Sequence, residues 1–373
     1  MDFSALDHAH MARALRLAAR GMHTTQPNPR VGCVIAHSEE IVGAGWHQRA
    51  GEPHAEVFAL RAAGERARGA TAYVTLEPCA HFGRTPPCAD ALIGAGIARV
   101  VAACKDPNPK VAGGGFARLR AAGIAVETGL MRDAARELNC GFLSRLERGR
   151  PWVRVKLAQS LDGRTALANG SSKWITGEAA RADVQRWRAR SSAILSASGT
   201  VLADDPRLTA RLAAPDDAAD TDAGSGNIIA PLRVVLDRAL RIPATARVFD
   251  ASAPTLLVHA AHAAVSPQLP AHVERAPLAL DANGRLDLAE LLRLLAARGV
   301  NELQVESGPT LAGALFEAQL VDELLLYVAA VILGDQARPL LALPRLDDIS
   351  RGRRLRVIDQ RQVGDDLRFV LRE

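Results

Sequence analysis

Four side chains in the first hundred residues could together build a catalytic zinc centre. The segment AGEPHAEVFAL places His54 two residues before Glu56, and LEPCAHFGRTPPCAD places Cys79 and Cys88 further along the chain. A catalytic zinc ion takes three protein ligands and keeps its fourth position for water, and one imidazole with two thiolates supplies those three. Glu56 then remains to move a proton between that water and a leaving amine. Singly, His54 could begin a helix and each cysteine could be a small buried side chain; together they predict a zinc site.

The order of these residues follows the pattern of zinc-dependent deaminases that act on nucleobases. That pattern is H-x-E followed by P-C-x-x-C, in which the glutamate is a general acid and base and not a ligand. This chain departs from the pattern in its second half, because eight residues separate Cys79 from Cys88. The pattern favours hydrolytic removal of an exocyclic amine.

The elements that must position these residues alternate between helices and strands. A helical pattern over 5–21 precedes two strands that turn at His37–Glu40, and the rest follows in the order helix 53–64, strand 71–76, helix 88–95, strand 99–104, helix 113–122 and strand 124–129. This alternation predicts an α/β/α sandwich with a partly parallel sheet. It places the three candidate ligands at junctions of strands and helices, where helix N-termini favour thiolates.

The polar segment LERGRPW at 146–152 marks a boundary, and we expect two domains, 1–149 and 150–373. The second predicted domain is also α/β, with strands at 153–160, 193–197, 233–237, 255–260, 303–307 and 324–333 and helices at 178–190, 287–298 and 309–319. The low-complexity stretch 214–227 is predicted to be a surface loop. All five cysteines and seven of the ten histidines precede residue 150, so metal chemistry is expected in the first domain alone.

Composition excludes several classes of protein. A charged fraction of 23% and a hydrophobic fraction of 48% in 373 residues do not fit a disordered chain. No run of about 18 apolar residues and no leader-like start are present, so we expect a cytoplasmic protein without a membrane span. Five cysteines in such a chain argue against a disulfide framework. The basic excess lies in residues 1–150, with 19 Lys+Arg against 14 Asp+Glu, and suits an anionic small substrate.

The run TLEPCAHFGRTPPC, with HAE before it and DPNP after it, resembles the bifunctional pyrimidine deaminase/uracil reductase family of riboflavin biosynthesis. The resemblance covers nearly the whole chain, and the eight-residue cysteine spacing is that family's own. It implies a cytidine-deaminase-like N-terminal domain and an NADPH-dependent C-terminal domain with the dihydrofolate reductase fold. It also implies that His54, Cys79 and Cys88 bind zinc, that Glu56 shuttles the proton, and that the substrate pocket is lined by Asn28, His47, His81, Arg84, Asp106 and Asn108.

For the second domain the resemblance implies two further sets of residues. It places NADPH against Ala158, Trp174, Thr200, Asp204, Gly308, Pro309, Thr310, Leu311, Ala312, Gly313 and Ala314, and substrate against Ser172, Arg188, Leu208, Arg211 and Glu306. The residues alone are less specific. No G-x-G-x-x-G motif is present. The strand that runs into GPTLAGAL could cradle a pyrophosphate, but so could any junction of a strand, a glycine and a helix. We hypothesise that Lys156 polarises the sugar oxygen or imine at the carbon that accepts the hydride.

Three functions are weighed. The favoured one converts 2,5-diamino-6-(5-phosphoribosylamino)pyrimidin-4(3H)-one to 5-amino-6-(5-phosphoribosylamino)uracil, and then reduces it with NADPH to the ribityl compound. A nucleic-acid base deaminase with a C-terminal binding domain needs stacking aromatics and a basic stripe, and only 4% of residues are aromatic. A non-catalytic scaffold with structural zinc needs a fourth protein ligand. A homo-oligomer, dimer or tetramer, is expected; the apolar run 324–333 fits a strand that is either central or at a subunit interface.

Overall fold

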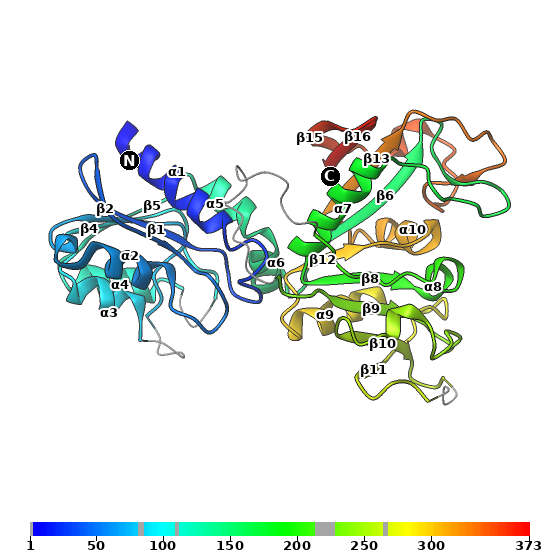
Figure 1. The fold of residues 1–373 in the computed structure, drawn as a ribbon, viewed down its shortest axis with the longest axis horizontal. Coiled ribbons are helices and arrows are strands. Elements are labelled where there is room, and N and C mark those ends of the chain that lie inside the picture. Colours follow the sequence, from blue (N-terminus) through cyan, green and yellow to red (C-terminus); the bar gives the residue numbers. More distant parts are fainter. Residues whose placement is uncertain (1–2, 81–85, 109–111, 213–227, 264–267) are drawn as a thin grey trace. The chain divides into compact units, whose positions relative to one another are not determined.

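A computed structural model describes residues 3–80, 86–108, 112–212, 228–263 and 268–373. Contacts divide the chain into two compact units (Figure 1). The first is built on Met1–Arg148, to which Ile228 and Ile229 also belong, and the second on Gly149–Ala214 and Ala230–Glu373. The division after Arg148 falls within the polar LERGRPW segment.

The first unit is a five-stranded sheet between two layers of helices, as expected for an α/β/α sandwich. The strand order is β2-β1-β3-β4-β5, formed by β1 (Gly32–His37), β2 (Glu40–Trp46), β3 (Thr71–Val74), β4 (Arg99–Ala102) and β5 (Ala125–Thr128). β1 is antiparallel to β2 and β3, whereas β3, β4 and β5 are parallel. In Figure 1 one face carries α1 (Ala5–Ala19) and α5 (Arg132–Leu138), and the other carries α2 (Ala55–Ala63), α3 (Cys88–Gly94) and α4 (Gly114–Ala121). Helix α6 (Cys140–Arg148) ends the unit.

Glycines on β2 let helix α2 lie directly against the sheet. A Cβ atom on Gly45 would stand 2.7 Å from the carbonyl oxygen of Ala55, and one on Gly43 would stand 2.2 Å from that of Ala59. Because no larger residue fits, the first turn of α2 packs at backbone distance from the strand. This contact fixes the distance of His54 and Glu56, which flank Ala55, from the sheet.

The second unit is a nine-stranded, mostly parallel sheet with the order β11-β10-β9-β8-β12-β6-β13-β16-β15. Its strands are β6 (Trp152–Ser160), β8 (Ala193–Ala197), β9 (Leu232–Leu236), β10 (Thr255–Ala260), β11 (Val273–Leu278), β12 (Glu302–Val305), β13 (Glu323–Ala329), β15 (Arg356–Val363) and β16 (Asp366–Arg372). Only β16 and β15 are antiparallel to their neighbours. The pair β7 (Arg164–Ala166) and β14 (Arg338–Pro339) stands apart from the main sheet.

The two faces of β6 differ in chemistry. Val153, Val155 and Leu157 join the apolar core that also contains residues of α9 (Leu288–Ala297) and α10 (Pro309–Glu317). The alternate residue Arg154 is fully buried, forms ion pairs with Glu302 and Glu323, and lies 4.5 Å from the ring centre of Trp187 on α7 (Glu178–Arg190). Since side chains alternate along a strand, Lys156 lies on the same charged face as Arg154.

Several expected elements differ in the structure. The strand expected over 324–333 ends at Ala329, and Val331 and Ile332 beyond it are exposed. β13 lies between β6 and β16, so its apolar run is explained by a central position. Sequence reasoning did not identify α5, α6, β11, the β15–β16 hairpin or helix α8 (Ser198–Asp204). The expected loop at 214–227 lies outside the described residues. Short 3₁₀ turns at Gly64–Ala67, Arg247–Phe249 and Ile349–Arg351 complete the structure.

Candidate functional site

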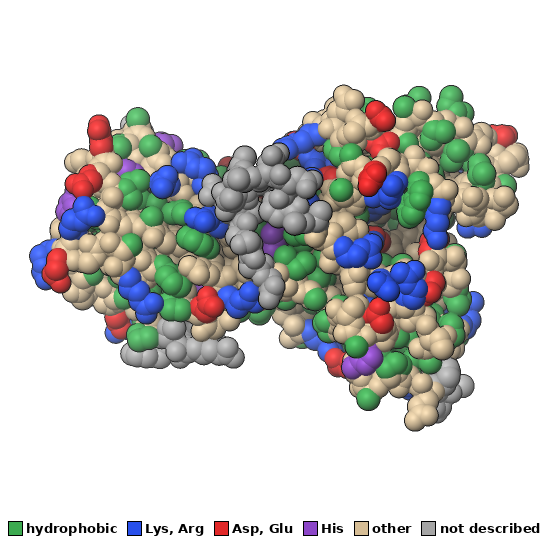
Figure 2. All heavy atoms as spheres, in the orientation of Figure 1, with side chains coloured by type: hydrophobic (Ala, Val, Ile, Leu, Met, Phe, Trp, Pro, Cys, Tyr) green, Lys and Arg blue, Asp and Glu red, His purple; other side chains and the backbone are tan. Residues whose placement is uncertain are grey.

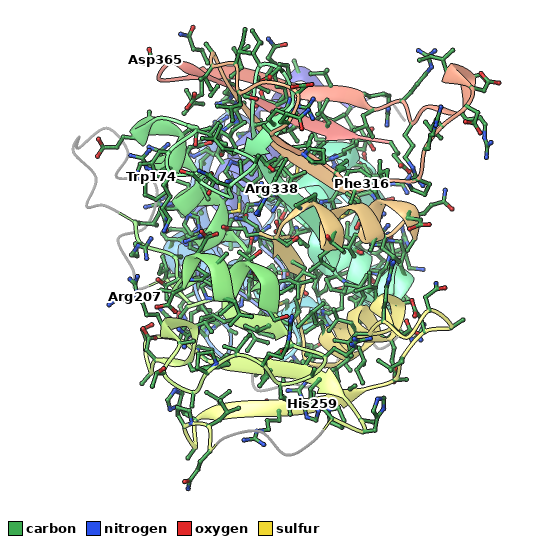
Figure 3. All side chains as sticks on the ribbon, turned by 90° about the vertical axis from the view of Figure 1, so that its right-hand side faces the viewer. Trp174, Arg207, His259, Phe316, Arg338 and Asp365 are labelled. Carbon is green, nitrogen blue, oxygen red and sulfur yellow. The ribbon has the colours of Figure 1, made fainter. Side chains whose placement is uncertain are left out.

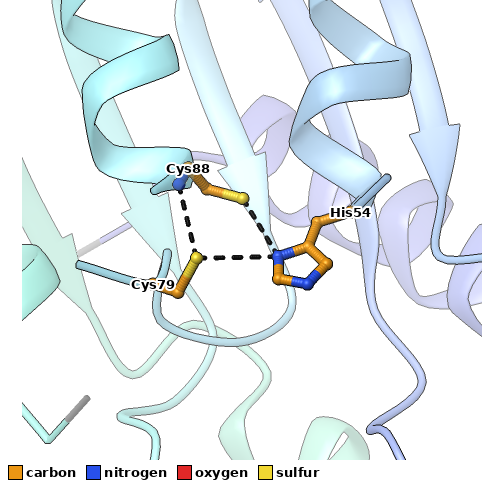
Figure 4. Close-up of side chains that lie close together, drawn as sticks. All are labelled: His54, Cys79 and Cys88. Carbon is orange, nitrogen blue, oxygen red and sulfur yellow. Dashed lines mark hydrogen bonds between the residues drawn. The ribbon is translucent and has the colours of Figure 1, made fainter. Parts of the chain in front are cut away.

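His54, Cys79 and Cys88 converge on one point (Figure 4). His54 is the N-cap of α2, Cys79 follows β3, and Cys88 is the first residue of α3. The His54 Nδ1 atom lies 3.2 Å from the Cys88 Sγ atom and 3.6 Å from the Cys79 Sγ atom. Tetrahedral zinc with ordinary bond lengths separates a nitrogen ligand from a sulfur ligand by about 3.6 Å. The three donor atoms therefore fit a zinc ion and supply three of its four ligands.

The two thiols have opposite tendencies to ionise. The hydrogen bond from Cys88, together with those from His54 and the Cys88 backbone N–H, lowers the pKa of Cys79 to about 4 against the effect of burial. The hydrogen bond to Cys79 and burial raise the pKa of Cys88. The same contact with Cys79 raises the pKa of His54. One thiolate is thus favoured by the protein alone, and a divalent cation is the group that would stabilise the second.

Glu56 lies in the first turn of α2, beside the three donor atoms but not among them. Its side chain is only 3% exposed, and burial raises its pKa to about 7. The negative charge of Cys79 acts in the same direction, whereas His54 and a hydrogen bond with Cys88 act against it. A carboxyl group that titrates near neutral pH can both take up and give back a proton.

Asn28 and His47 form a hydrogen-bonded chain beside the metal ligands. The His47 Nδ1 atom is 3.1 Å from the carbonyl oxygen of Pro53, and its Nε2 atom is 3.1 Å from the Asn28 Nδ2 atom. A carbonyl only accepts and an amide nitrogen only donates, so this pattern assigns a neutral ring with its proton on Nδ1. Burial lowers the pKa of His47 and agrees with that assignment. The His47 and His54 rings meet edge to face at 5.4 Å.

Asp106 and Asn108 follow β4 as Cys79 follows β3, so they lie at the same edge of the sheet. The Asp106 Oδ1 atom accepts a hydrogen bond of 2.8 Å from the Asn108 backbone N–H. His81 and Arg84 lie outside the described residues. Sequence reasoning missed Glu77, a buried carboxylate that accepts backbone hydrogen bonds from Asp106 and from the start of α4. Its only signal in the sequence is an acidic residue directly before Pro-Cys.

A second group of charges lies at the end of β12 in the other unit. Arg188 donates to both carboxylate oxygens of Glu306, at 2.7 and 2.6 Å, and Gln304 donates to the same carboxylate at 2.7 Å. Burial alone raises the pKa of Glu306, but the charge and hydrogen bonds of Arg188, with Lys156, lower it to about 2. Burial lowers the pKa of Lys156, against the attraction of Glu306. Lys156, Arg188 and Glu306 therefore form one electrostatic cluster.

This cluster makes the stability of the second unit dependent on pH. The carboxylate of Glu306 stabilises the fold above its unfolded-state pKa, and this contribution is lost as the pH falls from about 4.5 to about 2. The expected loss of unfolding free energy is on the order of 3 kcal/mol. Urea unfolding of the parental protein and of Glu306→Gln between pH 5 and pH 2.5 tests this. Parallel curves for the two proteins would contradict it.

Two of the expected NADPH residues, Thr200 and Gly308, meet beyond the carboxyl ends of β8 and β12. The chain proceeds outward from β6 through β8 to β11 and then returns to place β12 between β8 and β6. Ligands of open α/β sheets bind where the strand order reverses in this way. Gly308 caps α10, its N–H donates to Thr200 Oγ1 on α8 at 3.3 Å, and a Cβ atom on Gly308 would meet no atom within 4 Å. This open N-terminus of α10 fits a pyrophosphate, but most of the expected 308–314 turn is helical, and Ala312 and Gly313 within it are buried.

The remaining expected residues of this unit lie at several places around that edge. Trp174 is 69% exposed, so it is not a core residue, and the Arg181 guanidinium lies 4.6 Å from its ring centre. Trp174 and Arg207 project on the same side of the unit in Figure 3. Other placements are Ala158 on β6, Ser172 in the loop after β7, Asp204 at the end of α8, and Leu208, which is buried.

Arg211 belongs to a basic patch that we define as Arg188, Arg207, Arg211 and Arg247. Burial and repulsion from the other three arginines lower the pKa of Arg211. Its backbone N–H donates to Gln185 on α7 at 3.0 Å, which fixes the segment beside Arg188. Figure 2 shows Lys and Arg side chains gathered on the visible face of the second unit. Such a concentration of positive charge suits a phosphate group.

Comparison with known proteins matches each of the two units to a different domain family. Residues 4–104 match the cytidine and deoxycytidylate deaminase zinc-binding region, and residues 151–369 match the RibD C-terminal domain. The riboflavin biosynthesis protein RibD of Escherichia coli (strain K12) is 52% identical over 361 residues, covering 97% of this chain and 98% of that protein. Its counterpart from Haemophilus influenzae is 48% identical over 370 residues, covering 99% and 98%. No helix among the described residues is long and apolar enough to cross a membrane.

Solved structures agree over the full length. Acinetobacter baumannii RibD, form 1, superposes with a TM-score of 0.88 at 43% identity and covers 98% of both chains. The diaminohydroxyphosphoribosylaminopyrimidine deaminase/5-amino-6-(5-phosphoribosylamino)uracil reductase of Thermotoga maritima gives a TM-score of 0.84 at 32% identity, again covering 98% of both. The paired domains, their order and the convergent His-Cys-Cys donor set lead to one conclusion: the chain belongs to the RibD family of bifunctional deaminase/reductase enzymes of riboflavin biosynthesis.

Proposed function

We propose that the first unit deaminates 2,5-diamino-6-(5-phosphoribosylamino)pyrimidin-4(3H)-one and that the second unit reduces the ribosyl group of the product with NADPH. The observation that carries the proposal is the donor set of His54, Cys79 and Cys88 with the buried carboxyl group of Glu56 beside it. Three ligands and a separate proton carrier are what a hydrolytic zinc site needs, whereas a structural site uses four ligands.

In the deamination, His54, Cys79 and Cys88 would hold zinc, which as a Lewis acid would make water a nucleophile near neutral pH. Glu56 takes the proton of the attacking water and delivers it to the amine that leaves. Asn28 donates to His47 and is held in place by it, so that its amide can meet one edge of the pyrimidine. Asp106 and Asn108 meet the ring from the neighbouring strand end. We assign His81 and Arg84 to the same pocket, with Arg84 suited to the phosphate by charge.

In the reduction, NADPH supplies a hydride to the sugar carbon when it is bound. The N-terminus of α10, where the 308–314 segment begins, receives the pyrophosphate, and Ala158, Trp174, Thr200 and Asp204 contact the rest of the cofactor. Arg188 and Arg211 bind the substrate phosphate, and Ser172, Leu208 and Glu306 orient the substrate. Lys156, held in the cluster with Glu306 and Arg188, polarises the sugar oxygen or imine at the carbon that accepts the hydride.

Lys156→Ala should lower the reductase turnover by about 10²–10⁴-fold, the usual contribution of a general acid. Lys156→Met keeps the apolar stem and should lose as much, because only the ammonium group, whose Nζ atom lies 5.7 Å from the centre of the Tyr327 ring, is removed. NADPH affinity should stay near the parental value in both variants. Stopped-flow oxidation of NADPH and a fluorescence titration measure the two quantities. An unchanged rate in the Met variant would remove Lys156 from the mechanism.

The two half-reactions can be separated with the full-length protein. Incubation of the diaminopyrimidine ribotide without NADPH should release ammonia and yield only the deaminated ribotide. Addition of NADPH should then yield the ribityl compound. Deamination of a single-stranded oligonucleotide, with none of the ribotide, would favour the nucleic-acid deaminase instead. Purified zinc-loaded protein without either activity would favour the scaffold.

We also propose that the protein works in the cytoplasm, as a homo-oligomer and without nucleic acid. None of the described cysteines forms a disulfide bond, and thiolate ligands persist in a reducing compartment. The oligomer, a dimer or a tetramer, is supported by apolar side chains exposed on the β15–β16 hairpin, among them Val357, Ile358 and Leu367. Few aromatic residues are available to stack on bases.

A further inference from the structure

The carboxylate of Glu77 is saturated with backbone hydrogen bonds from one distant segment. Its Oε2 atom accepts from the N–H groups of Asp106 at 3.3 Å and Gly113 at 3.0 Å, and its Oε1 atom accepts from those of Gly115 at 3.1 Å and Phe116 at 3.3 Å. The residue is 4% exposed. None of the four donors is a side chain, so the hydrogen bonds of Glu77 depend on the conformation of the backbone and not on which side chains that segment carries.

The hydrogen bonds of Glu77 join two parts of the deaminase site, the loop that carries Cys79 and the segment that begins at Asp106. Glu77 stands two residues before the metal ligand Cys79, and the donors begin at Asp106 and end in the first turn of α4. The same helix start packs at backbone distance on the cysteine loop, because a Cβ atom on Gly115 would lie 1.9 Å from the carbonyl oxygen of Pro78. An anion at a helix N-terminus is also favoured by the helix dipole.

We propose that Glu77 is a positioning residue of the deaminase, which sets the distance between the metal ligands and the side chains of Asp106 and Asn108. This inference rests on the proposed function, in which those two side chains contact the pyrimidine. The carboxylate is suited to the task because it has an acceptor for every N–H group of the segment that it faces. Moving the substrate by about 1 Å from its reactive position can cost about 10²-fold in rate.

Glu77→Gln tests the proposal because it exchanges one acceptor oxygen for a donor NH₂ group of nearly the same size. One pair of N–H groups, either Asp106 with Gly113 or Gly115 with Phe116, then faces a donor and must move away. We expect kcat/KM for deamination of the ribotide to fall about 10²-fold, with a rise in KM. Zinc should remain at one ion per chain, and the reductase activity should be unchanged.

Asp7→Asn is the matched control for a purely structural carboxylate. Asp7 is 5% exposed in the same unit and accepts hydrogen bonds from Ser4, Tyr73 and Arg99. Asp7 itself is far along the chain from Asp106 and Asn108. This variant should melt at a lower temperature with kcat/KM unchanged. If Glu77→Gln also only melts lower, Glu77 is structural and the proposal is overturned.

Gly115→Ala provides a second route to the same displacement without changing the carboxylate. If Glu77→Gln is purified without zinc, this variant decides: a zinc-loaded Gly115→Ala protein with parental kcat/KM overturns the proposal, and a lowered kcat/KM supports it.

Asp106→Asn separates this inference from the proposed function. If it lowers kcat/KM while Glu77→Gln does not, the positioning role fails and the function stands. If Asp106→Asn has no effect, the assignment of Asp106 to the substrate fails, and the positioning role fails with it. If the parental protein releases no ammonia from the ribotide, the proposed function itself fails. The double variant Glu77→Gln/Asp106→Asn should lose less than the product of the two single losses, because both changes disrupt the contact of Asp106 with the substrate.

Discussion

Glu56→Gln should abolish deamination while the zinc content and the reductase activity stay at parental values. Glutamine keeps the size of the side chain and its contact with the first turn of α2, but it cannot carry a proton. General acid–base groups contribute about 10²–10⁴-fold, and here one carboxyl group serves both the attacking water and the leaving amine. We therefore expect a loss of at least about 10⁴-fold. Ammonia release, zinc content and NADPH oxidation with the deaminated ribotide measure the three quantities.

Glu65→Gln is the control for this variant, because Glu65 is an exposed acid in the turn that follows α2. It should deaminate at the parental rate. If Glu56 only stabilises its helix through the helix dipole, its replacement should cost about 0.3–1 kcal/mol of stability and little activity. A deaminase rate within about tenfold of parental in Glu56→Gln would remove this residue from the mechanism.

Cys79→Ala and Cys88→Ala should each release the zinc ion and end deamination, while the second unit continues to reduce pre-deaminated substrate. Only two donor atoms remain in either variant, and zinc in proteins is held by at least three. The metal content should fall from about one ion per chain to background. Atomic absorption of the purified proteins and the two separate activity assays test this expectation.

Cys140→Ala controls for the loss of a buried thiol, since Cys140 begins α6 and is not among the three donor residues. It should keep its zinc. Removal of the metal from the parental protein by a chelator should reproduce the Cys79→Ala result and be reversed by added zinc. Equal loss of both activities on chelation, with the fold intact, would contradict two independent sites.

The zinc centre could be predicted because its residues lie in short sequence motifs next to predicted helices and strands. His54 and Glu56 share one helix start, and each cysteine adjoins an element that the hydrophobic pattern reveals. The alternating sandwich of the first unit was predicted for the same reason. Glu77 could not be predicted in this way, because its partners are backbone N–H groups 29 to 39 residues downstream and no residue type marks them.

The second unit shows where pattern reasoning stops. β15 was missed because six of its eight residues are exposed, so it lacks the alternation that identifies a half-buried strand. Helix α8 was missed because its seven residues are too few to show a helical period. On β6 the valines reveal the strand, but the burial of Arg154 depends on Glu302 and Glu323, about 150 and 170 residues away.

The position of β6 in the middle of its sheet also governs the order in which the protein can be assembled during translation. All five strands of the first sheet have been synthesised once Thr128 is made, and each pairs with a strand near it in sequence. β6 begins at Trp152, yet both of its neighbours, β12 and β13, are synthesised only after residue 301. At about 5–20 residues per second, a nascent β6 therefore waits on the order of ten seconds with both edges unpaired. During that interval the chain already has the strands of a complete deaminase sheet, whereas its reductase half still lacks the two strands that pair with β6.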